Sequence, residues 1–114
     1  MLSTAQYKNL LKAINLASHA GKCVWLTSKS GKLYPSCVVA HLAILEGWSN
    51  SELSDWVFGE YFEDQGVMPP ILEGYPQDLL KNIVTMWDAY PPNDDDLAKT
   101  ELSKFVEKAF YEQE

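Results

Sequence analysis

The chain has 114 residues, of which 46% are hydrophobic and 22% charged, and its formal net charge is −7. This length and apolar content suit a single compact domain over residues 1–114 and exclude a wholly disordered chain. No apolar run approaches the roughly 20 residues that cross a bilayer, and the first residues lack a charged-then-apolar signal sequence, so we expect a cytoplasmic protein without membrane contacts.

Charge is unevenly distributed along the chain. Residues 1–32 hold five lysines and no acid, residues 33–80 hold eight acids and no basic residue, and the remainder holds four lysines and eight acids. Arginine, the preferred side chain for contacts with phosphate and guanine, is absent, so we expect no direct binding of nucleic acid. The acidic middle segment indicates solubility, a basic partner, or mimicry of a nucleic-acid backbone.

The first predicted element is a helix over roughly residues 4–19. Ser3 and Gln6 have the spacing of a capping box, and apolar residues recur at helical spacing from Tyr7 to Ala17. Gly21 is placed to end this helix in a left-handed conformation. Residues 22–27 and 32–34 then predict a small hairpin around the turn residues 28–31. Two strands alone are marginal in water, so the hairpin must lie against helices.

Three further helices and a loop lead towards the end of the chain. Residues 37–46 are apolar around much of the circumference, which predicts a buried helix. Ser49 and Glu52 form a second capping box, which opens an acidic and aromatic helix. Residues 66–74 contain two adjacent prolines and predict a loop. Pro76 at a first helical position then opens the next helix, which stops at residues 91–94.

The last predicted helix begins at an aspartate run and has the clearest apolar stripe. Any of the three aspartates can cap it and offset its dipole. We expect Phe105 in the core, where truncation to alanine costs about 3–5 kcal/mol. The fold class is therefore mainly α (α+β), with about five helices and one small β-hairpin packed on the helical core. The aspartates are Asp94, Asp95 and Asp96, and the stripe is Leu102, Phe105, Val106, Ala109 and Phe110.

The order of a helix, a tryptophan-containing hairpin and a cysteine-initiated apolar helix spans residues 4–46. It resembles small domains found in phages and bacteria. The resemblance assigns no functional residue, and it implies an accessory protein of a phage or mobile element.

Two groupings of cysteine and histidine could carry chemistry. Cys37 opens a predicted helix, where the dipole favours a thiolate, and His41 lies four residues on as a possible base. The alternative is a buried thiol beside a core histidine. His19, Cys23, Cys37 and His41 are the right types for zinc, but they lack the usual C-x2-4-C pair. We expect no cofactor and no metal, and two cysteines do not form a disulfide framework.

Two acidic groupings have structural explanations. The run from Asp94 to Asp96 lacks the glycine and the twelfth-position acid of an EF-hand, which leaves the capping role. The pairs Glu52/Asp55 and Glu60/Glu63 would support acid–base chemistry only inside a cleft, and they otherwise form a solvated face. The sequence also lacks G-x-S-x-G, a Walker loop, G-x-G-x-x-G and H-E-x-x-H.

Aromatic and methionine residues from Trp48 to Tyr75 exceed what one short helix can bury, so they are either core or a protein-binding patch rimmed by acids. We therefore predict a non-enzymatic acidic binding module, of inhibitor, antitoxin or immunity type, that docks on a basic and possibly nucleic-acid-binding site of another protein. The alternative is a small thiol enzyme or zinc domain that uses Cys37 and His41. The predicted partner-binding residues are Glu52, Asp55, Phe58, Glu60, Phe62, Glu63 and Asp64.

Overall fold

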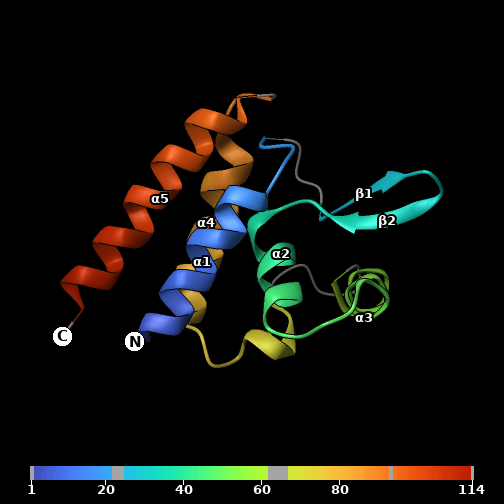
Figure 1. The fold of residues 1–114 in the computed structure, drawn as a ribbon, viewed down its shortest axis with the longest axis horizontal. Coiled ribbons are helices and arrows are strands. Elements are labelled where there is room, and N and C mark those ends of the chain that lie inside the picture. Colours follow the sequence, from blue (N-terminus) through green and yellow to red (C-terminus); the bar gives the residue numbers. More distant parts are fainter. Residues whose placement is uncertain (1, 22–24, 62–66, 93, 114) are drawn as a thin grey trace.

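The computed structural model describes residues 2–21, 25–61, 67–92 and 94–113 (Figure 1). The expected fold class is confirmed, since helices dominate and the strands form one antiparallel hairpin. No helix in these ranges is both long and apolar enough to span a membrane. In chain order the elements are α1 (Thr4–Leu16), β1 (Leu26–Lys29), β2 (Lys32–Pro35), α2 (Val38–Leu45), α3 (Asn50–Trp56), the π-helical η1 (Val57–Tyr61), the 3-10 turn η2 (Pro70–Leu72), α4 (Gln77–Ala89) and α5 (Asp95–Glu112).

The helix α2 occupies the centre of the fold, as its sequence predicts. It packs against α1 on one side and α4 on another, while α5 lies against both α1 and α4 (Figure 1). A helix that is apolar around its circumference needs neighbours on several sides to remove that surface from water. The buried residues of α2 are Val38, Val39, Ala40, Leu42 and Ala43.

The helix α1 has the predicted capping box at Ser3 and Gln6 but ends at Leu16, three residues earlier than expected. Ala17 is extended, and His19 has a positive φ of 62°. The backbone beyond Leu16 is bonded to distant segments instead of to the helix, because the Ser18 N–H donates to the Ser36 carbonyl at 2.8 Å. Gly21 does adopt the left-handed conformation, with φ of 77°, but inside this loop and not at the helix end.

The hairpin has a tighter turn than the sequence suggests. Ser30 and Gly31 alone connect the strands, and both have positive φ, as a type I′ turn requires. The described part of the first strand begins at Leu26, later than predicted, and residues 22–24 lie outside the described residues. Only β2 contacts α2 and α3 closely, and the tip projects from the molecule (Figure 1).

The last two helices bury narrower stripes than predicted. Pro76 precedes α4 as its N-cap rather than occupying its first turn, and Leu80, Ile83 and Trp87 are the buried residues of this helix. On α5 the buried residues are Ala98, Leu102 and Val106, which repeat every four positions. Phe105 lies at the edge of this stripe and is only partly buried, so its predicted place in the core is corrected.

Candidate functional site on α3 and η1

The helix α3 is anchored on one side and open on the other. The Ser49 Oγ accepts the Glu52 N–H, and a Glu52 carboxylate oxygen accepts the Ser49 N–H, each at 3.1 Å. This capping box confirms the predicted helix start and gives Glu52 a structural role. Leu53 and Trp56 are buried beneath the helix, while Asp55 on the opposite side is exposed.

A π-helical turn follows α3 directly. The Val57 N–H is shared between the carbonyls of Leu53 and Ser54, where the winding changes. A π-turn takes more residues per turn than an α-helix, so it shifts the phase of the side chains that follow. Val57, four residues after the buried Leu53, is buried as well, whereas Phe58 is 56% exposed and Glu60 is exposed.

The aromatic residues divide between core and surface. Trp56 packs between Trp25 and Trp48, with ring centroids 5.3 and 6.2 Å away. Trp25 and Trp56 are buried, as is Tyr75, and these rings join the foot of the hairpin to α3 and the helical core. These tryptophans are therefore part of the core and not of an exposed binding patch. Phe58, by contrast, is 56% exposed.

The predicted partner-binding residues fall into two groups. Glu52, Asp55, Phe58 and Glu60 are all exposed residues of the consecutive elements α3 and η1. Phe62, Glu63 and Asp64 lie outside the described residues. In the described part of the chain the ion pair between Lys104 and Glu101 on α5, at 3.9 Å, is the only one found. The α3 carboxylates are therefore not neutralised by described lysines.

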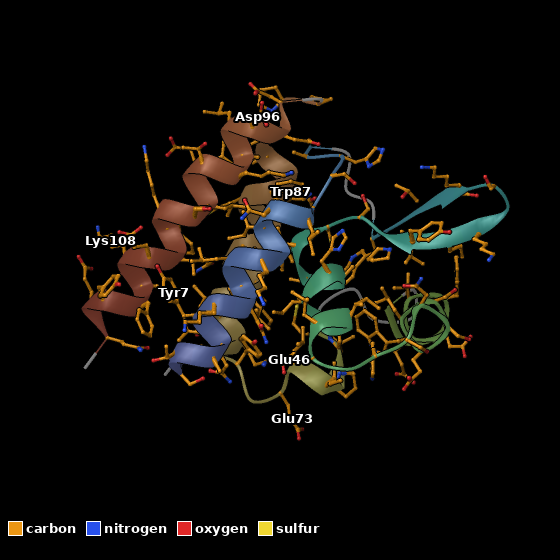
Figure 2. The ribbon with its side chains drawn as sticks, viewed as in Figure 1. Tyr7, Glu46, Glu73, Trp87, Asp96 and Lys108 are labelled. Atoms are coloured by element: carbon orange, nitrogen blue, oxygen red, sulfur yellow. The ribbon has the colours of Figure 1, made fainter. Side chains whose placement is uncertain are left out.

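The other acids of the middle segment are placed elsewhere. The Glu46 carboxylate accepts hydrogen bonds from the Tyr75 hydroxyl at 2.5 Å and from Asn9 Nδ2 at 3.1 Å. Burial, followed by the nearby Glu46, raises the pKa of Tyr75 and keeps its proton in place. Glu73 is exposed near η2, at the lower edge of the molecule in Figure 2 and apart from α3. The acidic surface is thus the α3 and η1 group and not the whole acidic segment.

Cys37 is a buried N-cap of α2. Its Sγ accepts the Ala40 N–H at 3.4 Å, and burial raises the pKa of the thiol to about 12, so the neutral form dominates at pH 7. Burial and the charge of Lys99 lower the pKa of His41, and no hydrogen bond joins His41 to the thiol in the described structure. The cavity beside Cys37 and Trp87 measures about 10 Å³, enough for one water molecule at most.

The His19 ring lies within hydrogen-bonding distance of two serine hydroxyls. Its Nδ1 lies 2.9 Å from the Ser18 Oγ and 3.2 Å from the Oγ of the buried Ser36. Within the ranges that the structure describes, no group of three or more His, Cys, Asp or Glu residues could hold a metal ion. Cys23, the remaining member of the zinc hypothesis, lies outside the described residues.

Sequence reasoning missed the role of Asp95. Its carboxylate accepts the backbone N–H groups of His19 at 3.2 Å and Ala20 at 2.9 Å, a contact across 75 residues or more. Asp94 is the N-cap of α5 but makes no side-chain capping bond, so the predicted capping role is corrected. Asp95 and Asp96 do occupy the first turn, where they offset the helix dipole. Local sequence holds no signal for a bond to so distant a segment.

Comparisons with protein-family models, with curated proteins and with solved structures gave no match.

Proposed function

We propose that this chain is a non-enzymatic binding protein whose acidic surface on α3 and η1 docks on a basic site of another protein. The observation that carries the proposal is the exposure of Asp55, Phe58 and Glu60 on the consecutive elements α3 and η1, where the two carboxylates form no ion pair with described lysines. Aromatic side chains supply much of the energy of protein interfaces, and surrounding charges select and steer the partner.

The type of partner follows from the chemistry of this surface. Carboxylates on a short exposed segment present negative charge in the manner of a nucleic-acid backbone. A basic site that binds nucleic acid is therefore the class of target that this surface fits, and an inhibitor, antitoxin or immunity protein would use it. An accessory protein of a phage or mobile element, which the resemblance of residues 4–46 implies, is one setting in which such a binding protein would act.

The alternative of a thiol enzyme receives less support. A nucleophilic cysteine needs a thiolate, access for substrate and a base. Cys37 is 6% exposed with its pKa raised to about 12, and the cavity beside it has no room for a substrate.

A matched pair of charge reversals tests the proposal. Asp55→Lys with Glu60→Lys changes the candidate surface, and Glu107→Lys with Glu112→Lys makes the same charge change on exposed positions of α5. The wild-type chain and both variants are used as baits in native lysate, and captured proteins are quantified by mass spectrometry. We expect a protein retained by the wild type and the α5 variant to be lost by the α3 variant, with binding that weakens as salt rises.

Equal retention of every captured protein by the two variants would overturn the proposal. It would mean that binding does not depend on whether the reversed charges lie on α3 and η1 or on α5. A triple charge reversal of Glu60, Glu63 and Asp64 to lysine extends the test to the neighbouring residues. It should weaken association and its salt dependence without lowering the melting temperature.

A further inference from the structure

The hairpin carries two lysines directly opposite each other beside its turn. Lys29 and Lys32 are cross-strand partners in the register, so their side chains leave the same face of the hairpin, and both are exposed. Like charges at directly opposed positions destabilise a pair of strands. Within the described residues neither lysine forms an ion pair that would offset this repulsion. The hairpin tip, which projects from the molecule, therefore presents uncompensated positive charge (Figure 1).

The same face of the hairpin borders α3. Tyr34 follows Lys32 by two residues, so it lies on this face, and its side chain is 39% exposed. Because β2 and α3 pack directly against each other, the groove of about 450 Å³ that they line is a depression of the surface. Lys32 and Tyr34 belong to its strand wall and Asp55 to its helix wall. A lysine and an aspartate therefore open onto the same side of the molecule.

The opposite charges on this side are not paired with each other. In the described structure no ion pair joins Lys32 to Asp55, and Glu60 on η1 has none either. Two such charges side by side select neither a wholly basic nor a wholly acidic partner. They favour a surface that carries the same two charges in the reverse order. A two-fold rotation of the same surface produces that order, because an isologous interface brings one patch against its own copy.

Exposed apolar side chains lie on the same elements. Of the six large hydrophobic residues exposed in the described ranges, Leu33 and Tyr34 belong to β2 and Phe58 belongs to η1. Ion pairs between exposed side chains are individually weak, so a stable interface also needs apolar contact. A second copy would in addition cover the hairpin, of which only β2 packs closely against helices in the described chain.

We propose that two copies of this chain associate through this face about a two-fold axis, with Lys29 and Lys32 of each copy against Asp55 and Glu60 of the other. The inference goes beyond the proposed function, because the partner is the chain itself, and it holds or fails independently. Self-association uses the same carboxylates as docking on another protein, so the two events compete.

Charge reversal on each side of the contact tests this arrangement. Sedimentation equilibrium of the purified wild-type chain over about a hundredfold range of concentration should show a reversible dimer that weakens as salt rises. Lys29→Glu with Lys32→Glu should raise the Kd of the dimer at least about tenfold, and so should Asp55→Lys with Glu60→Lys. The reason is that each variant places like charges at both contacts of its own dimer.

A mixture of the two variants gives the sharpest measurement. In the mixed dimer the acidic hairpin of one chain meets the basic α3 and η1 of the other. The unchanged lysines and carboxylates meet at the second contact, so both contacts regain opposite charges. We expect the mixture to form heterodimers about as tightly as the wild type forms homodimers. A chain with all four substitutions should self-associate as well.

Matched reversals on α5 control for the change in net charge. Lys104→Glu with Lys108→Glu, and Glu107→Lys with Glu112→Lys, alter exposed positions of that helix and should leave the Kd of the dimer within about twofold.

Four results would each overturn the inference: a wild-type chain that stays monomeric, face variants that dimerise as tightly as the wild type, mixed variants that stay apart, or equal weakening by the α5 reversals. A monomeric wild-type chain would leave the proposed function standing, because that function is tested by capture of a different protein.

Discussion

The layer built from α1, α2, α4 and α5 and the region built from the hairpin and α3 differ in how fully their polar groups are used. In the helical layer, distant segments are joined by specific bonds. The Gln113 side chain donates to the Leu2 carbonyl at 2.6 Å and accepts the Leu2 N–H at 2.7 Å. The Asp95 carboxylate accepts two backbone N–H groups of the loop after α1. In the region of the hairpin and α3, Leu33 and Asp55 are exposed. Binding capacity therefore remains where folding has not used the polar groups.

The largest expected effect is the loss of a core side chain in the helical layer. Leu42 on α2 is fully buried, so Leu42→Ala should lower the free energy of unfolding by about 3–5 kcal/mol. Leu33→Ala in the exposed hairpin should change it by less than about 0.5 kcal/mol. Urea denaturation measures both values. Similar losses at the two positions would mean that the hairpin belongs to the same cooperative core.

An intermediate effect is expected at Asp95. Asp95→Ala leaves the N–H groups of His19 and Ala20 without their acceptor, so it should cost about 1.5–3 kcal/mol, the usual range for hydrogen bonds to a charged group. Asp96→Ala removes an exposed first-turn carboxylate and should cost less than about 1 kcal/mol. Thermal denaturation of the two variants gives the comparison. Equal costs would show that the aspartates act only through the helix dipole.

A pH effect should distinguish buried Cys37 from a surface thiol. Its pKa is raised from an ordinary value of 9.0 to about 12 in the folded chain. Between these values the unfolded chain loses the proton and the folded chain keeps it, so this contribution to stability is complete below pH 9 and falls as pH rises towards 12. In a Cys23→Ala background, Cys37→Ala should flatten the decline of stability over this range. The native thiol should also resist alkylation at pH 8, and rapid alkylation would contradict its burial.

The smallest expected effect is that of the acidic surface on folding. Asp55 and Glu60 are exposed and form no ion pair with described lysines, so their reversal to lysine should change the free energy of unfolding by less than about 0.5 kcal/mol each. Urea denaturation measures this change in free energy. A large drop in the free energy of unfolding would mean that the α3 carboxylates stabilise the fold. The two regions would then no longer differ in how folding uses their polar groups.

The candidate site was only partly predictable from sequence. The charge run and the capping box at Ser49 indicated an acidic helix near residue 52, and the structure places Glu52, Asp55, Phe58 and Glu60 on it. Periodicity could not reveal the π-turn, because that turn changes the very spacing on which periodicity depends. The packing of β2 against α3 was also not predictable, because these two elements come together only in the folded chain.

The sequence by itself determined the elements whose causes are local. Both capping boxes, the hairpin and the all-round apolar helix α2 follow from residues within one or two turns of each other, and short-range sterics and hydrogen bonds act at that distance. Tertiary structure decided where α1 ends, which face of α5 is buried and which backbone groups bond to the Asp95 carboxylate. These outcomes depend on competition between a local bond and one from a distant segment, and the winner is fixed only when the segments pack together.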